Sequence, residues 1–169
     1  MAAGARDRRV RLKRETVVSV MRIDGYLDKR YEPPAPFVRA TVLSKALELR
    51  HMVNFHVDTG AAVTTLLDKD VKRLNINLEK LESAERSLFG IGGSLTTYII
   101  EDSALLFQAG NGKVIEERLR IYVGAHDVER LSKVERKLIL ELPSLLGRDL
   151  IYRFKLVLDK FQNQVCLER

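Results

Sequence analysis

The chain has 169 residues, of which 46% are hydrophobic and 31% charged, and its formal net charge is +6 at pH 7. This length suits one domain with an ordinary core, and so large an apolar fraction excludes an intrinsically disordered chain. The longest stretch without a charge, residues 87–100, is shorter than the roughly 18 residues that a membrane-spanning helix requires. A single cysteine, Cys166, cannot form an internal disulfide, and we recognise no secretory signal, so we expect a soluble cytoplasmic protein.

The positive charge is concentrated at the start of the chain. Residues 1–14 contain six basic side chains and one acidic side chain, whereas residues 15–169 contain 23 basic and 22 acidic ones. A basic arm of this kind attracts phosphates or acidic surfaces in some proteins, but blocks of like charge usually remain solvated. We therefore expect no association with a membrane. We also expect no nucleic-acid partner for the rest of the chain, since only the basic arm is suited to attract one.

Residues 1–35 are predicted to be a basic N-terminal arm and a Pro-rich connector, either partly disordered or holding a short strand. The β-branched segment 16–21 favours a strand, and Asp24-Gly25 is typical of a turn. The densest group of prolines, at 33–36, predicts a stiff extended connector. The main domain is therefore expected over residues 36–169.

From residue 37 onward the pattern is that of short strands. We expect strands over 37–43, 53–57, 63–66, 96–100, 104–107, 119–123, 155–158 and 164–167. Three short helices are expected: 68–74, capped by Asp68; 127–138, where Val128, Leu131, Val134 and Leu138 recur at helical spacing; and 148–154. The apolar face of the second helix is expected to pack into the core. Together, these strands and helices predict a mainly β fold, either closed or sandwich-like.

The segment Phe55-His-Val-Asp-Thr-Gly-Ala-Ala-Val-Thr64 carries the chemistry. An apolar strand runs directly into Asp58, where burial disfavours a charged carboxylate. Gly60, which has no side chain, lets another backbone or a ligand approach closely. The Thr59 hydroxyl is able to hydrogen-bond locally or across an interface. Taken alone, the segment is equally compatible with an ordinary turn between two strands.

Two later segments favour a functional interpretation. Residues 88–95 are rich in glycine and predict a flexible hairpin. This run lacks the Lys-Ser/Thr ending of a phosphate-binding loop, and it does not match the dinucleotide pattern G-x-G-x-x-G. Residues 145–151, Leu-Leu-Gly-Arg-Asp-Leu-Ile, place two apolar residues and a glycine directly before a helix.

In this order and spacing, the three segments resemble the retropepsin-like (retroviral-type) aspartic proteases over roughly residues 37–169. Strands after the Gly-Arg-Asp helix make the layout similar to the cellular and prokaryotic single-domain members. The resemblance implies a closed β-barrel of the acid-protease type with short helices, built as a homodimer. It also implies an aspartic endopeptidase that hydrolyses peptide or protein substrates and uses no cofactor and no metal.

The resemblance implies roles for individual residues. Asp58 would be catalytic, in an active-site loop with Thr59, Gly60 and Ala61. The substrate-binding flap would comprise Phe89, Gly90, Ile91, Gly92 and Gly93, and structural support would come from Leu146, Gly147, Arg148 and Asp149. Thr59 would lock the two active loops of the dimer together.

The number of Asp-Thr-Gly segments supports a dimer independently of the resemblance. The mechanism needs two carboxylates and the chain has one such segment, so a two-fold axis beside Asp58 would supply the second from an identical chain.

Ala61 stands where pepsin-like enzymes commonly carry a hydroxyl that stabilises the charged carboxylate. The pair is therefore expected to retain its shared proton to higher pH, with a weakly acidic optimum. Ala62 replaces an acid that pairs with the arginine in many retroviral members, so Arg148 must have another partner.

Two alternatives remain open. A catalytically silent dimer of the same fold would bind peptides or assist assembly, and a nucleic-acid-associated factor would use the basic arm. The three histidines, His51, His56 and His126, do not form a metal-ligand spacing with Cys166, which is expected to be packed or interfacial.

Overall fold

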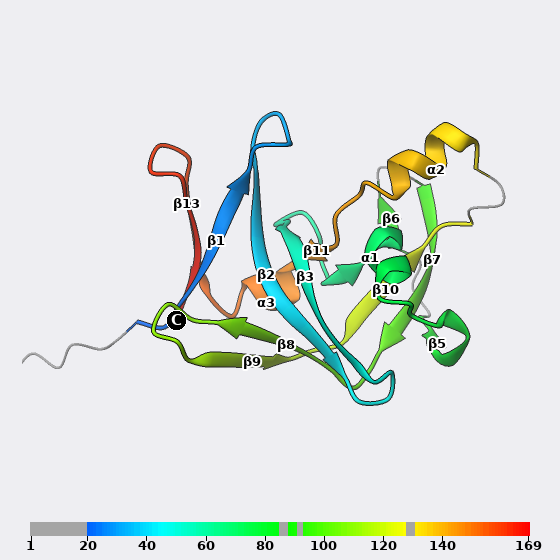
Figure 1. Cartoon of the computed structure of the whole chain (residues 1–169), viewed down its shortest axis with the longest axis horizontal. Coiled ribbons are helices and arrows are strands. Elements are labelled where there is room, and N and C mark those ends of the chain that lie inside the picture. Colours follow the sequence, from blue (N-terminus) through cyan, green and yellow to red (C-terminus); the bar gives the residue numbers. More distant parts are fainter. Residues whose placement is uncertain (1–19, 85–87, 91–92, 128–130) are drawn as a thin grey trace, which may run out of the picture.

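The computed structural model describes residues 20–84, 88–90, 93–127 and 131–169 (Figure 1). Its strands are β1 (Arg22–Asp28), β2 (Ala35–Ser44), β3 (Leu49–Val57), β4 (Thr65–Leu66), β5 (Glu82–Ser83), β6 (Leu88–Gly90), β7 (Gly93–Ile100), β8 (Ser103–Gln108), β9 (Val114–Arg118), β10 (Ile121–Ala125), β11 (Leu145–Leu146), β12 (Lys155–Asp159) and β13 (Gln164–Glu168). The helices are α1 (Asp68–Arg73), α2 (Lys133–Ile139) and α3 (Arg148–Ile151), with a 3-10 turn at Leu78–Lys80. The predicted mainly β fold with a few short helices is confirmed.

The strands join in the order β12-β13-β1-β2-β3-β11-β4-β10-β7-β5, with β6 beside β7, β8 beside β2, and β9 beside β8. In the part of the chain described, this path ends at β12 on one side and at β5 on the other, so the sheet is not a closed barrel. The expectation of a closed barrel is therefore wrong. Alternating apolar residues show that each strand buries one face, but they do not show which strand edges pair.

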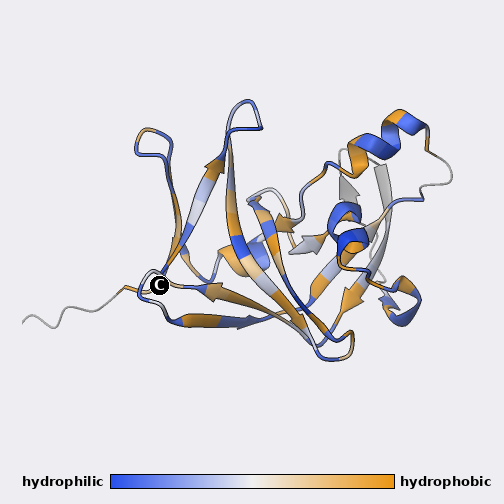
Figure 2. Cartoon of the chain, in the orientation of Figure 1, coloured by the Kyte–Doolittle hydropathy of each residue, from blue (hydrophilic) through white to orange (hydrophobic). Residues whose placement is uncertain are grey.

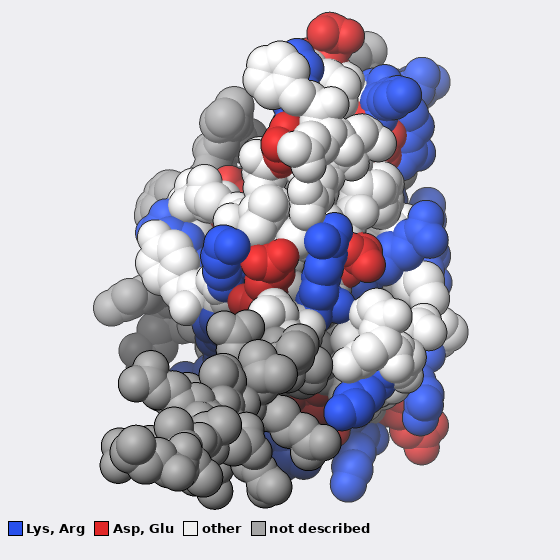
Figure 3. Space-filling view, turned by 90° about the vertical axis from the view of Figure 1, so that its left-hand side faces the viewer, with Lys and Arg blue, Asp and Glu red and all other residues white. Residues whose placement is uncertain are grey.

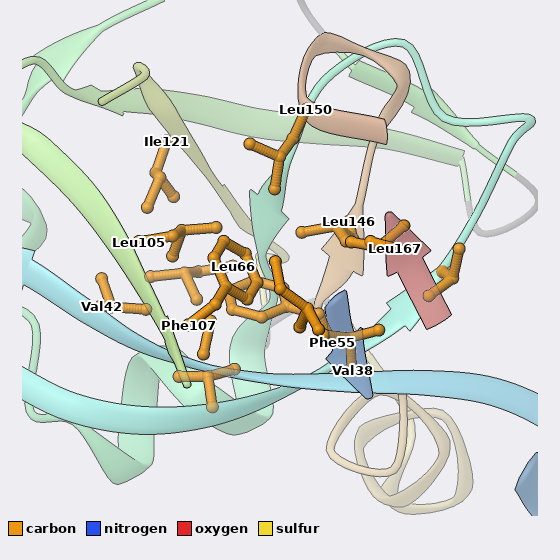
Figure 4. Close-up of a cluster of buried hydrophobic side chains, with 14 of the residues drawn as sticks. Val38, Val42, Phe55, Leu66, Leu105, Phe107, Ile121, Leu146, Leu150 and Leu167 are labelled. Carbon is orange, nitrogen blue, oxygen red and sulfur yellow. The ribbon is translucent and has the colours of Figure 1, made fainter. Parts of the chain in front are cut away.

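The core lies inside the curve of this sheet (Figure 4). Along β3, Val53, Phe55 and Val57 are buried while Asn54 is exposed, as the strict alternation predicts. The other labelled members of the cluster lie on strands, except Leu150, which lies on α3: Val38, Val42, Leu66, Leu105, Phe107, Ile121, Leu146, Leu150 and Leu167. Figure 2 shows the same alternation of polar and apolar residues along the strands. The strand that carries Asp58 at its end is therefore anchored in the centre of the core.

The turn expected at Asp24-Gly25 is absent, because both residues lie inside β1. Gly25 pairs with Val38 of β2, and a Cβ atom at Gly25 would lie only 2.4 Å from the carbonyl oxygen of Phe37. The glycine thus permits two backbones to approach closely rather than turning the chain. Residues 16–19 lie outside the described part, and the division of the chain at residue 36 stays a prediction.

The helix expected over 127–138 begins later and packs differently. Ser132 and Glu135 form a capping box, so α2 starts at Lys133. The side chains of Val134 and Leu138 are 70% and 57% exposed, and Ile139 is the buried residue of the helix. The expectation that this apolar face packs into the core is therefore wrong, since helical spacing alone does not show what covers a face. Val128 lies outside the described residues.

Charges of both signs are interleaved on the face that carries β13 and β1 (Figure 3). One example is the ion pair between Lys155 Nζ and Glu168 Oε2, at 3.1 Å. This mixture agrees with the near balance of charge over residues 15–169. No helix in the described ranges is long and apolar enough to cross a membrane.

Candidate active site

The loop that carries Asp58 begins where β3 leaves the core. One carboxylate oxygen, Oδ1, accepts hydrogen bonds from the backbone N–H of Gly60 at 2.8 Å and of Ala61 at 3.3 Å. A Cβ atom at Gly60 would lie 3.0 Å from this oxygen, so a side chain there would crowd the carboxylate. The turn therefore holds the Asp58 carboxylate in a defined orientation, half-buried, at the edge of the fold.

The short strand β11 joins the two ends of the loop that carries Asp58. Leu146 pairs with Val57, in parallel with β3, and its carbonyl oxygen accepts the N–H of Asp58 at 3.1 Å. On its other side, Leu145 pairs with Thr65 of β4. The backbone of Leu146 therefore holds the strand end from which Asp58 projects.

Gly147 is required where the chain passes directly over the other end of the loop. A Cβ atom at Gly147 would lie 2.3 Å from the carbonyl carbon of Val63 and 2.8 Å from the backbone nitrogen of Thr64. Contacts that short with backbone atoms cannot be relieved by a side-chain rotation. Only glycine lets β11 and the Asp58 loop pack this closely.

A hydroxyl–carboxylate pair that the sequence analysis did not identify ties the loop to α3. The Asp149 carboxylate accepts hydrogen bonds from the backbone N–H of Thr64 at 3.0 Å and from its hydroxyl at 2.8 Å. The same hydroxyl accepts the N–H of Gly147 at 3.2 Å, and Thr64 is fully buried. The sequence signal for this pair was Thr64, the hydroxyl residue at the end of the Asp-Thr-Gly segment, together with Asp149, the acid at the start of the predicted helix.

Arg148 has its hydrogen-bond partners on the Asp58 loop itself. Its Nη1 atom donates to the carbonyl oxygens of Thr59 at 2.9 Å and of Gly60 at 3.0 Å. The backbone N–H of Arg148 also donates to the carbonyl oxygen of Ala61 at 3.0 Å. These carbonyls provide the partners that an acid at position 62 would otherwise supply, and they anchor the outer turn of the loop to α3.

The predicted flap is a hairpin of β6 and β7. Phe89 pairs with Ser94 and Gly90 with Gly93, while Ile91 and Gly92 lie outside the described residues. The long strand β7 continues the hairpin into the main sheet, where it pairs with β10. The structure thus brings Asp58, Thr59, Gly60 and Ala61 together with Leu146, Gly147, Arg148 and Asp149, and holds the hairpin on the adjoining strands.

His56 is the nearest titratable neighbour of Asp58 along β3. Its ring lies 5.4 Å from the ring of Phe37, centroid to centroid. Burial lowers the pKa of the His56 imidazole below its ordinary value, and the charge of Asp58 opposes this shift. Below about pH 6.5 the unfolded chain therefore takes up a proton on His56 more readily than the folded chain. Folding stability is thus lost through this group as the pH falls.

We expect the variant His56→Gln to lose less unfolding free energy than the wild type between about pH 7 and pH 5. Urea unfolding at several pH values measures this difference. The matched control is His51→Gln, on the same strand but with an exposed side chain. If His56→Gln follows the wild-type pH dependence, burial of His56 does not contribute to acid destabilisation.

An Asp-Thr-Gly loop held by β11 and by a Gly-Arg-Asp helix, next to a hairpin that continues into the main sheet, defines the retropepsin-like fold.

Among solved structures, the chain is similar to a retropepsin-like aspartic protease from Rickettsia conorii, with a TM-score of 0.52 and 21% identity. That match covers 89% of this chain and 92% of the other. The chain is also similar to the EIAV protease complexed with the inhibitor HBY-793, with a TM-score of 0.43, 20% identity, and coverage of 73% and 93%. No protein-family model and no curated protein matches the chain. At these identities the likeness concerns the fold, and the predicted retropepsin-like fold is confirmed.

Proposed function

We propose that the protein is an aspartic endopeptidase whose catalytic centre is completed by a second copy of the chain. The observation that carries the proposal is the Asp58 carboxylate, held by two backbone N–H groups in a loop that is anchored on β11 and α3. Such a loop is a rigid half of a two-carboxylate centre. Because the chain has one Asp-Thr-Gly segment, a two-fold axis beside Asp58 supplies the other half.

In the proposed reaction the two carboxylates share one proton, because two such charges a few ångströms apart cannot both ionise without a large cost. The ionised Asp58 takes a proton from a bound water, and this water attacks the carbonyl carbon of the scissile peptide bond. The protonated Asp58 of the other subunit donates to the developing oxyanion. The Asp58 that took the water proton then donates it to the leaving amine as the C–N bond breaks. A hydroxyl of the tetrahedral intermediate returns its proton to the other carboxylate, which restores the pair with one shared proton.

The surrounding residues have supporting roles in this proposal. Thr59 links the two loops across the axis, and Gly60 leaves room for the substrate backbone. The hairpin with Phe89, Gly90 and Gly93 closes over the peptide, which excludes water from the site. Arg148 keeps the carbonyls of Thr59 and Gly60 in place. An extended peptide fits this arrangement.

The test is cleavage of a peptide library at several protein concentrations, combined with a solution mass measurement. We expect cleavage between about pH 3 and pH 7, with a weakly acidic optimum. The activity per chain should rise with concentration in parallel with the dimeric fraction, since a monomer holds half a centre. Activity that is independent of concentration in a monomeric protein would contradict the shared centre. A dimer that binds peptides but cleaves none would support the catalytically silent alternative.

A further inference from the structure

A hollow opens on the outer face of the sheet, where β1 and β8 separate from each other along β2. Residues 37–44 of β2 pair with β3 on one edge, so β1 and β8 share the other edge. On that edge β1 pairs with residues 35–38 and β8 pairs with residues 41–44. Arg39 and Ala40 pair with neither of these two strands, so a gap lies between β1 and β8 at this point.

The far side of this gap is closed. Ile23 of β1 bridges to Ala109, directly after β8, and the N–H of Gly110 donates to the carbonyl oxygen of Arg22 at 2.9 Å. In Figure 1, the start of β1 and the end of β8 accordingly lie close together near the mark C. The hollow framed in this way has a volume of about 520 Å³, which is within the range of pockets that bind small molecules.

Small residues keep the hollow open. Ala40 and Ala109 line it and are only 2% and 3% exposed, so they form its floor. Gly110 and Gly112 also line it, and a Cβ atom at Gly112 would meet no atom within 4 Å. Because larger side chains at these four positions would fill the space, the room for a ligand is set by the sequence.

The polar side chains of Arg39, Thr41 and Gln108 line the same hollow. Arg39 and Thr41 are two residues apart on β2 and therefore lie on the same face of the sheet. Since Thr41 pairs with Leu106, the register of β2 with β8 places Gln108 opposite Arg39 across the gap. The guanidinium carbon of Arg39 lies 5.1 Å from the centroid of the Tyr26 ring, a contact that restrains the arginine beside the hollow.

The guanidinium of Arg39 is available to an anion. In the part of the chain that the structure describes, it has this ring contact and no carboxylate partner. Asp24, which also lines the hollow, is already paired with Arg22, whose Nε atom lies 2.6 Å from its Oδ1. The hollow therefore presents an unpaired cation beside a carboxylate. This arrangement favours a monoanion, because Asp24 would repel a dianion such as phosphate more strongly.

We propose that this hollow binds the C-terminal residue of a peptide, that is, an acylated amino acid with a free carboxylate and an apolar side chain. Arg39 donates paired hydrogen bonds to the carboxylate, and the Thr41 hydroxyl donates one more. The side-chain oxygen of Gln108 accepts the N–H of the last peptide bond. The apolar side chain lies on the floor formed by Ala40 and Ala109, which removes its surface from water.

This site is separate from the candidate active site. Among the described residues, none from the Asp58 loop lines the hollow. Met52, the lining residue nearest to Asp58 in the sequence, is six residues before it, which corresponds to about 20 Å along an extended strand. The inference therefore goes beyond the proposed function and does not depend on it.

The test titrates N-acetyl-leucine into the full-length protein and follows the backbone amide signals by NMR. We expect saturable shifts at Ala40, Thr41 and Gly110, and at least about 10-fold weaker binding of N-acetyl-leucinamide, which lacks the carboxylate. Arg39→Gln should weaken binding of N-acetyl-leucine about 10-fold and change the affinity for the amide less than about 2-fold. The matched control is Arg50→Gln, an exposed arginine on β3 outside the hollow, which should leave both affinities unchanged.

A second arm distinguishes a peptide end from a free small acid. N-acetyl-Ala-Ala-Leu should bind at least as tightly as N-acetyl-leucine, since only its last residue enters the hollow. If the longer peptide binds more weakly, the site takes a free acid and the assignment to a peptide end is overturned. Equal affinities of wild type and Arg39→Gln, or tighter binding of inorganic phosphate than of N-acetyl-leucine, would overturn the carboxylate site itself.

Discussion

Replacing Asp58 by asparagine is expected to lower peptide cleavage by at least about a thousandfold, with the chain still folded. The amide is nearly the same size as the carboxylate, and its oxygen is still able to accept the N–H groups of Gly60 and Ala61. It cannot take a proton from water, so the catalytic step is lost while the loop is retained. Cleavage of a fluorogenic peptide and a thermal unfolding curve measure the two effects. The control Asp24→Asn changes an exposed carboxylate on β1 and should leave cleavage intact.

Mixing experiments test whether the centre is shared between two chains. When equal amounts of wild type and Asp58→Asn exchange subunits freely, about one quarter of the dimers contain two intact carboxylates. The activity per wild-type chain should then fall to about half. Activity that stays proportional to the wild-type protein alone would show that each chain works independently, and the proposed two-fold centre would be wrong.

The second large effect is expected for Gly147→Ala, which should destabilise the fold by about 3 kcal/mol. The added methyl group would lie 2.3 Å from the Val63 carbonyl carbon and 2.5 Å from its oxygen, so the backbone of the Asp58 loop or of β11 must move. For a domain of this size, the loss corresponds to a fall in Tm of roughly 10 °C. Any variant protein that remains folded should also cleave more slowly, because Asp58 and β11 move together.

The control for this variant is Gly110→Ala. The closest atom to a Cβ at Gly110 is the Oδ2 of Asp24 at 3.5 Å, an ordinary contact, so the effect on stability should stay within about 0.5 kcal/mol. Urea unfolding of both variants gives the comparison. Equal stability of Gly147→Ala and wild type would show that the loop and β11 do not pack as closely as the structure indicates.

Much of the local structure follows from the sequence alone. The alternation of Val53, Phe55 and Val57 predicts the buried face of β3, and both final strands are found within one residue of their predicted bounds. The order of the Asp-Thr-Gly, glycine-rich and Gly-Arg-Asp segments also indicated the fold. These signals are readable because each depends on neighbouring residues along the chain: a period of two, a turn-forming residue or a short motif.

Other features depend on contacts between residues far apart in the sequence, and no local pattern contains them. Gly25 lies inside a strand because the Phe37 backbone passes close by, and Gly147 is required by the Val63 backbone. Arg148 binds carbonyls of a loop nearly ninety residues away in the chain.

The sequence by itself determined many of the short strands, the three motif segments and their order, because these depend on side-chain period and local backbone preference. Only the tertiary structure decided that the sheet stays open and that α2 leaves its apolar face uncovered. It also decided that Thr64, Asp149 and Arg148 hold the Asp58 loop. The physical reason is that hydrophobic burial is non-directional: it favours covering each apolar face, but long-range packing and hydrogen bonding decide which partner covers it.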